Sequence, residues 1–91
     1  MIDKILDRYY FKKLKNKIEK YMLLMHSLSY DYYVEYSNNH LYLYIKKVKY
    51  TNYIRLLTID EDWILSNLVN FRKLANLIDK YIELYAEENN G

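Results

Sequence analysis

Residues 30–47, YDYYVEYSNNHLYLYIKK, constrain the fold more than any other part of this chain. Two runs of aromatic, β-branched and aliphatic residues flank Asn38-Asn39. Asparagine is one of the few residues other than glycine that tolerate the positive φ angles of a type I′ turn. The pattern therefore predicts a β-hairpin with a two-residue turn at these asparagines.

A two-residue turn also fixes which residues of the two strands face each other. One face would carry the pairs Tyr36–Leu41, Val34–Leu43 and Tyr32–Ile45, and the other Asp31–Lys46, Tyr33–Tyr44 and Glu35–Tyr42. Aliphatic and aromatic side chains meet each other in these pairs, and so do opposite charges, which are the combinations that stabilise a sheet. A shift by one residue would move every side chain to the wrong face, so we expect this register.

A third antiparallel strand is predicted from the alternation in YIRLLTI, residues 53–59. Its connection to the hairpin would be a short turn near Thr51-Asn52. Alternation would place Ile54, Leu56 and Thr58 on one face, and Tyr53, Arg55 and Leu57 on the other. The aliphatic pairs Val34–Leu43 and Ile45–Leu56 assign the first of these faces to the core.

Apolar residues at alternating spacings of three and four predict a helix before the hairpin and another after the third strand. The first stripe consists of Phe11, Leu14, Ile18, Tyr21, Met25 and Leu28, and the second of Ile64, Leu68, Phe71, Ala75, Ile78, Ile82 and Tyr85. Asp60 or Thr58 is the expected cap of the second helix. Ser66-Asn67 or Asn70 would act as a second cap and divide it in two.

The predicted order of elements is therefore α-β-β-β-α, and the predicted fold class is α+β. We expect a three-stranded antiparallel meander with helices packed on one face, the last helix being continuous or split. Residues 1–86 would form a single domain, and residues 87–91 a frayed C-terminal tail.

The composition excludes several kinds of chemistry. The chain has no cysteine, no proline and one glycine, Gly91, so it lacks thiolate metal sites, disulfides and glycine-rich phosphate loops. Two histidines, His26 and His40, are too few for a multi-histidine metal site, and no acid is spaced to complete a catalytic set with His26-Ser27. We therefore expect no enzyme, no catalytic residue and no cofactor.

Three consecutive acids, Asp60-Glu61-Asp62, are the only other arrangement that suggests a ligand. Their carboxylates could hold a divalent cation. Acids at the start of a helix are explained more simply by capping and by the helix dipole. We therefore expect no metal site.

The first residues, MIDKILDRYYFKK, carry charges every few positions and lack the apolar core of a signal peptide. No apolar run is long enough to cross a bilayer. Together with the absence of cysteine, this predicts a cytoplasmic protein that does not act at a membrane. Lys, Asn, Ile and Tyr make up 42 of the 91 residues, which is typical of AT-rich coding DNA and indicates a low-GC bacterium or one of its phages.

The net charge of +2 is unevenly distributed. Residues 1–20 carry seven basic and three acidic side chains, residues 46–55 carry four basic and no acidic ones, and residues 59–91 carry three basic and seven acidic ones. A strong nucleic-acid binder is expected to be more uniformly basic.

Thirteen tyrosines are more than a core of this size can absorb, because each buried hydroxyl needs a partner. Tyr32 and Tyr36 share a face with the aliphatic residues and are assigned to the core. The opposite sheet face would be partly open. We predict a protein-binding site there, formed by Tyr33, Tyr42, Tyr44, Lys46 and Arg55, since tyrosine and arginine are enriched at protein interfaces.

Two other surfaces stay open as alternatives. Lys12, Lys15, Lys46 and Lys47 would serve a small RNA- or DNA-binding protein whose tyrosines stack on bases. Ile2, Ile5, Leu6 and Tyr9 cluster almost opposite the main stripe of the first helix. Either the helix bends or breaks near Tyr10, or these four residues form a patch for a second copy of the chain. We therefore expect a homodimer or a complex with another protein.

These features favour a non-catalytic protein-interaction module. In size, composition and order of elements the chain resembles phage and mobile-element accessory proteins, including the anti-CRISPR inhibitors of bacterial defence. The resemblance implies a partner of the host defence ribonucleoprotein type, blocked by steric occlusion in the cytoplasm of the host cell. Acidic DNA mimicry is not expected, because the net charge is positive.

Overall fold

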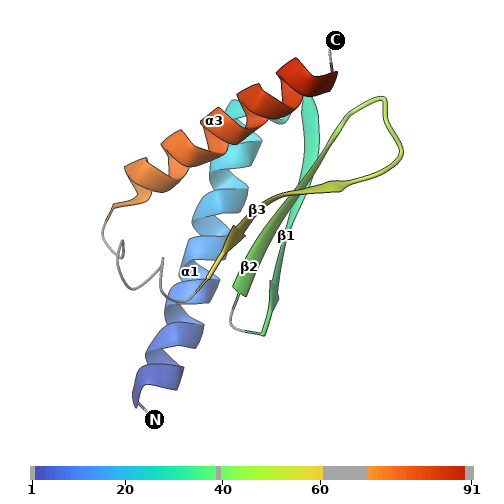
Figure 1. Ribbon diagram of the computed structural model, residues 1–91. Coiled ribbons are helices and arrows are strands. Elements are labelled where there is room, and N and C mark those ends of the chain that lie inside the picture. Colours follow the sequence, from blue (N-terminus) through green and yellow to red (C-terminus); the bar gives the residue numbers. More distant parts are fainter. Residues whose placement is uncertain (1, 39, 61–69, 90–91) are drawn as a thin grey trace.

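The computed structural model describes the backbone of residues 2–38, 40–60 and 70–89, and side chains within these ranges from Phe11 to Glu88. It consists of α1 (Ile2–Met25), β1 (Tyr30–Ser37), β2 (His40–Lys47), β3 (Ile54–Ile59) and α3 (Phe71–Asn89), shown in Figure 1. The predicted α-β-β-β-α order and the α+β fold class are confirmed.

The three strands form an antiparallel meander in the order β1-β2-β3. Every predicted pair of the hairpin is present, from Asp31 opposite Lys46 to Tyr36 opposite Leu41. Asn38 has a φ of 52°, the left-handed conformation that the predicted turn requires. The Nδ1 atom of His40 donates a hydrogen bond of 2.6 Å to the Asn38 carbonyl, so local contacts hold the turn in this register.

The strand β3 departs from simple alternation. Ile54 lies opposite Ile45 and Leu57 opposite Leu43, so the sheet has an irregularity that leaves Leu56 as an extra residue. The predicted Ile45–Leu56 pair and the outward-facing Leu57 are therefore wrong, since Leu57 is buried and Thr58 is exposed. Strict alternation would have exposed a leucine and buried a hydroxyl without a partner, and the bulge avoids both costs.

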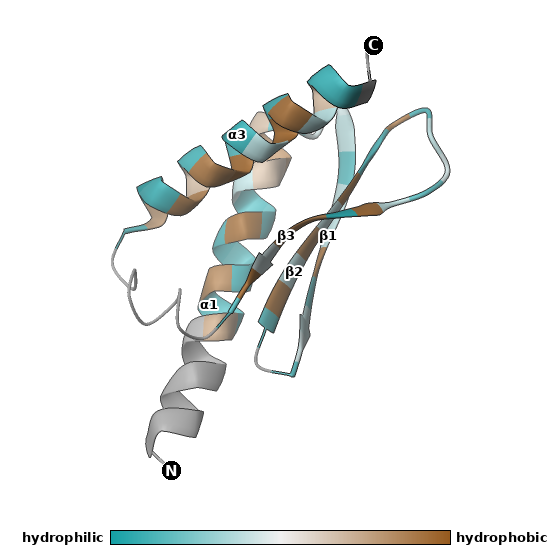
Figure 2. Cartoon of the chain, in the orientation of Figure 1, coloured by the Kyte–Doolittle hydropathy of each residue, from teal (hydrophilic) through white to brown (hydrophobic). Residues whose placement is uncertain are grey.

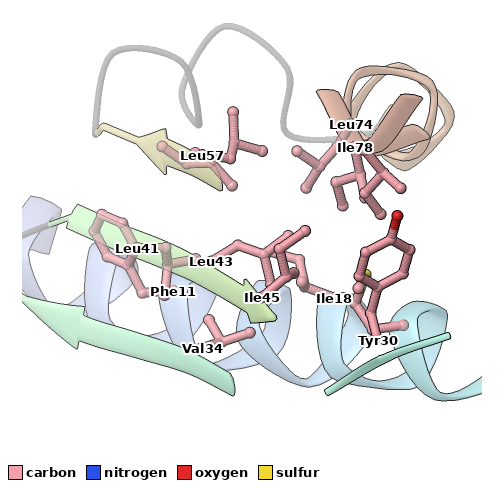
Figure 3. Packing of buried hydrophobic residues seen from close by; sticks show 13 residues of the cluster. Phe11, Ile18, Tyr30, Val34, Leu41, Leu43, Ile45, Leu57, Leu74 and Ile78 are labelled. Carbon is pink, nitrogen blue, oxygen red and sulfur yellow. The ribbon is translucent and has the colours of Figure 1, made fainter. Parts of the chain in front are cut away.

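One hydrophobic core lies between the sheet and the two helices. The centre of the sheet contributes Leu41, Leu43 and Ile45, α1 contributes Phe11, Ile18 and Met22, and α3 contributes Leu74, Ile78 and Ile82. Figure 3 shows side chains from both helices converging on the same side chains of β2. Because the two helices share one cluster with alternate residues of β2, they pack on the same face of the sheet, as predicted.

The apolar stripe of α1 differs from the prediction at its C-terminal end. Met25 and Leu28 are 61% and 97% exposed, while Met22 is fully buried. The helix ends at Met25, and the Tyr30 amide donates to the His26 carbonyl at 2.9 Å to close the turn into β1. The last apolar positions of the stripe therefore lie beyond the part of α1 that faces the sheet. The helix runs unbroken through Tyr10, so of the alternatives considered for this position a break is not present.

The second described helix begins after a cap. The Oδ1 atom and the carbonyl of Asn70 both accept from the Lys73 amide at 3.3 Å, which is the geometry of an N-cap. The cap predicted at Asn70 is confirmed, whereas residues 61–69, with Ser66-Asn67, lie outside the described residues. Figure 2 shows the alternation of apolar and hydrophilic residues along α3. The helix continues to Asn89 and so includes part of the tail assigned to residues 87–91.

Removing a side chain from the centre of β2 should be costly. We expect Leu43→Ala to lower the free energy of unfolding by about 3 kcal/mol, because Leu43 is fully buried and its methyl groups leave a cavity. The control is Leu84→Ala on the exposed side of α3, with an expected loss below about 1 kcal/mol. Urea unfolding followed by circular dichroism measures both, and equal losses would contradict this account of the core.

Candidate functional site

The sheet face opposite the helices carries the predicted protein-binding residues. Along β2, buried Leu41, Leu43 and Ile45 alternate with half-buried Tyr42 and Tyr44. The neighbouring strand contributes Tyr33, which is 40% exposed. The tyrosines assigned to this face therefore lie on it and are accessible, because alternation turns them away from the core.

The rings on this face are packed against one another. Tyr33 stacks on Tyr44 with ring centroids 4.5 Å apart and planes inclined by 14°. Tyr53, just before β3, meets Tyr33 edge-on at 4.8 Å, and Tyr42 lies 6.4 Å from Tyr44. These four residues, Tyr33, Tyr42, Tyr44 and Tyr53, form what we call the tyrosine face. The sequence alone did not show that Tyr33 and Tyr44 would stack face to face.

Two cations are anchored on the tyrosine face. The guanidinium carbon of Arg55 lies 5.3 Å from the centroid of the Tyr42 ring. The Lys46 ammonium donates to Asp31 Oδ2 at 2.7 Å and lies 5.6 Å from the Tyr53 centroid. Both contacts are of the kind that a cation makes with a ring quadrupole or a carboxylate. The fold thus brings the predicted site residues Lys46 and Arg55 together with the tyrosines. Both cations already contact neighbouring side chains of this face.

The Tyr33 phenol of the tyrosine face keeps its proton at ordinary pH. Partial desolvation raises the pKa of Tyr33, and the nearby Tyr44, Glu35 and Tyr53 raise it further. A phenol that keeps its proton can donate a hydrogen bond to a carbonyl or carboxylate of a partner. The face therefore offers apolar ring area together with hydroxyl donors.

The lysines considered for nucleic-acid binding are not gathered into one patch. Lys12 and Lys15 line a groove of about 610 Å³ between α1 and β1, which Glu35 also lines. Lys15 pairs with Glu19 at 3.6 Å. Lys47 lies at the other end of the hairpin, where its ammonium is 5.5 Å from the Tyr50 centroid. Only Lys46 lies on the tyrosine face.

The predicted oligomer interface cannot be placed in the same way. Ile2, Ile5, Leu6 and Tyr9 belong to α1, but their side chains lie outside the described residues. Their role at an interface stays a prediction.

A polar cluster between the two helices was not predicted. The Tyr21 hydroxyl donates to Asp79 Oδ2 at 2.6 Å, and His26 Nε2 donates to Asp79 Oδ1 at 2.8 Å. Burial raises the pKa of Tyr21 to about 12, and the hydrogen bond and charge of Asp79 contribute to the increase. Tyr21 and Asp79 are 58 positions apart, so no local spacing in the sequence could have indicated this contact.

This cluster does not have the arrangement of a catalytic site. Ser27 donates its hydroxyl to the Leu23 carbonyl at 2.6 Å rather than facing the His26 ring as a nucleophile would. Among the described side chains of residues 11–38, 40–60 and 70–88, no group of three or more possible metal ligands comes together. Glu61 and Asp62 lie outside these ranges. The cluster therefore joins α1 to α3, and the tyrosine face is the best candidate for a functional surface.

No protein-family model, curated protein or solved structure matches the chain. The functional proposal for this protein therefore rests on the geometry of the tyrosine face. Within the described residues, no helix is both long and apolar enough to span a bilayer.

The polar cluster predicts a specific alkaline destabilisation. The folded-state pKa of Tyr21 is about 12 against an ordinary value of 10, so its contribution to stability is complete below pH 10 and is lost as the pH rises towards 12. We expect Tyr21→Phe to make the free energy of unfolding fall less steeply between pH 10 and pH 12. Urea titrations at several pH values measure the slope, and an unchanged slope in the variant would contradict this linkage.

Proposed function

We propose that this protein is a non-catalytic interaction module that binds another protein through the tyrosine face. The observation that carries the proposal is the stacked pair of exposed Tyr33 and half-buried Tyr44 on the sheet face that neither α1 nor α3 covers. Large aromatic side chains at accessible positions are the residues that most often dominate the binding energy of protein interfaces.

The tyrosine side chains are already held in place in the free protein, and this favours binding. Because Tyr33, Tyr44 and Tyr53 already contact one another, docking a partner on them costs little additional side-chain entropy. Tyrosine itself has only two side-chain torsions to fix and presents both a large ring and a hydroxyl. Arg55 and Lys46 add charges at defined positions next to the rings, which would set the orientation of the partner.

The charges of this face favour a protein over a nucleic acid. Asp31 and Glu35 lie on the same face as the tyrosines, and their carboxylates would repel phosphate. The ammonium of Lys46 is held by Asp31, and Lys12, Lys15 and Lys47 lie away from the rings. Binding of RNA or DNA through these lysines is therefore the weaker of the two proposals.

The proposed biological role is inhibition of a host defence complex by steric occlusion, in the cytoplasm of a low-GC bacterium. The support for this role is the small size, the AT-biased composition and the absence of recognisable catalytic motifs in the sequence. A rigid sheet face with a fixed set of rings suits a protein that covers part of a larger assembly.

The first test is a pull-down with the tagged protein from a low-GC bacterial lysate, comparing wild type with Tyr44→Ala. We expect recovered partner proteins to be lost with this variant, because truncating a central aromatic residue typically costs about 2 kcal/mol, or roughly thirtyfold in affinity. Leu84→Ala removes an exposed apolar side chain from the helical layer and should leave recovery unchanged. Equal recovery with Tyr44→Ala and wild type would contradict docking on this face.

A nuclease-treated half of the same lysate separates protein binding from nucleic-acid binding. Partners that depend on the tyrosine face should survive nuclease treatment, and their binding should change little with ionic strength. Loss of all captured material after nuclease, or affinity that falls steeply with salt, would instead support a phosphate-binding surface. In that case Lys12→Gln and Lys15→Gln should weaken binding, and Tyr44→Ala should not.

A further inference from the structure

The strand β1 forms one edge of the sheet (Figure 1), because within the described residues it pairs with β2 only. The Val48 amide donates to the Ser29 carbonyl at 3.3 Å, in continuation of the hairpin register. In an antiparallel pair, every second residue exchanges its backbone hydrogen bonds with the neighbouring strand, and the residues between turn theirs the other way. Since Ser29 bonds towards the β2 side, the amides and carbonyls of Tyr32 and Val34 point to the outer edge of β1.

A groove of about 610 Å³ runs along this edge, and we call it the edge groove. Residues 33–36 of β1 line it in succession, so side chains from both faces of the strand take part. The two faces of a strand meet at its edge, and the groove therefore lies against the outward-pointing backbone groups. Phe11, Lys12 and Lys15 of α1 form its other wall. Tyr36, assigned to the core from the sequence, is 38% exposed because it lies at this margin, with its ring centroid 4.6 Å from that of Phe11.

The opposite edge of the sheet is less suited to pairing with a further strand. The irregularity at Leu56 lies in β3, and a bulge interrupts the backbone ladder. The groove between β3 and α3 measures only about 180 Å³. By contrast, β1 pairs regularly over all eight of its residues. A long and regular edge strand is the kind to which another strand can be added.

The charges of the edge groove differ between its two faces. Lys12, which is exposed, and Lys15 belong to α1 and so lie on the side of the core. Lys15 pairs with Glu19 at 3.6 Å, but both side chains are partly exposed, and such a pair is weak enough for Lys15 to contact a second carboxylate. Among the described lining residues Glu35 is the only acid, and it lies on the tyrosine side of β1. The helix side of the groove is therefore basic.

We propose that an extended acidic segment of a partner protein binds in the edge groove as a fourth, antiparallel strand next to β1. Its backbone completes the hydrogen bonds of Tyr32 and Val34, which is the β-augmentation mode of peptide recognition. Residues directly opposite each other in antiparallel strands share a face. The residue that bonds to Val34 therefore turns its side chain towards α1, where an acid meets Lys12 and Lys15.

A second copy of this chain fits the edge groove less well than an acidic partner does. If two β1 strands paired about a two-fold axis perpendicular to the sheet, each would keep its face. Lys12 and Lys15 of both copies would then share one face, and Asp31 and Glu35 of both copies the other. Like charges would meet on both faces, and directly opposed like charges destabilise strand pairing.

This inference goes beyond the function proposed above and does not depend on it. The edge groove uses backbone groups of β1 and two lysines of α1, whereas the tyrosine face uses aromatic rings. The two surfaces adjoin, because Tyr33 belongs to the tyrosine face and also lines the groove. A single partner that adds a strand to β1 can therefore extend over the stacked rings as well.

Synthetic peptides test the addition of a strand. The probe is a fluorescently labelled octapeptide of alternating glutamate and valine, which has all its carboxylates on one face when extended. With the glutamates turned to α1, their own amides point to β1 and the valine amides point away. By fluorescence anisotropy, we expect N-methylation of the glutamate amides to weaken binding at least about tenfold, since it removes the donors. N-methylation of the valine amides should have little effect. Equal binding of the two methylated peptides would overturn the proposal, because methylation does not change the charge.

Charge reversal tests the two lysines. The double variant Lys12→Glu/Lys15→Glu should bind the glutamate peptide at least about tenfold more weakly, and should bind instead a peptide of alternating lysine and valine. The control is Lys17→Glu/Lys20→Glu, which changes the net charge equally at exposed positions of α1 that are not among the described lining residues. This control should bind as the wild type does, and circular dichroism verifies that both variants are folded. Equal weakening by the two double variants would overturn the placement in the edge groove.

Further outcomes separate this proposal from the others. Tyr44→Ala should keep the peptide, because Tyr44 is not among the described lining residues of the edge groove. If that variant lost the peptide, the peptide would lie on the tyrosine face and the edge proposal would fail. Loss of the pulled-down partner's dependence on Tyr44, with peptide binding retained, would refute only the tyrosine-face proposal. A wild type that sediments as a dimer and binds no peptide would overturn the proposal in favour of a second copy at the edge.

Discussion

The register of the β1–β2 hairpin is the constraint on which the rest of this structure depends. A turn with Asn38 in the left-handed conformation allows only one alignment of the two strands. That alignment sends Leu41, Leu43 and Ile45 to one side and Tyr42 and Tyr44 to the other. Because β2 is the central strand, its alternation decides both where α1 and α3 can pack and which side chains are left on the uncovered face.

A sheet covered on one side only needs side chains that tolerate partial exposure, and tyrosine meets this requirement. Its ring packs against neighbouring rings while its hydroxyl remains in contact with water. Tyr33, Tyr44 and Tyr53 therefore stabilise the open face and, by the same contacts, present a fixed aromatic surface. The structural and the proposed binding roles of these residues rest on the same property.

The two helices differ in how they meet the rest of the protein. The helix α1 ends at Met25, and both Met25 and Leu28 of the turn that follows are exposed. The helix α3 crosses the same region, where Asp79 accepts hydrogen bonds from Tyr21 and His26. A polar contact thus joins the helices where the hydrophobic core ends, next to a surface whose apolar side chains remain exposed.

The sequence by itself determined the order of elements, the hairpin register and the face of each hairpin tyrosine, and it offered Asn70 as one of two alternative caps. These depend on turn chemistry and on periods of two and 3.6 residues, which act over a few positions. Only the tertiary structure decided the bulge that buries Leu57, the choice of Met22 over Met25 for the core, and the contact of Asp79 with Tyr21. Each of these depends on where a helix lies relative to the sheet or to the other helix. That position is set by packing between segments far apart in the chain. Local periodicity in the sequence carries no information about such packing.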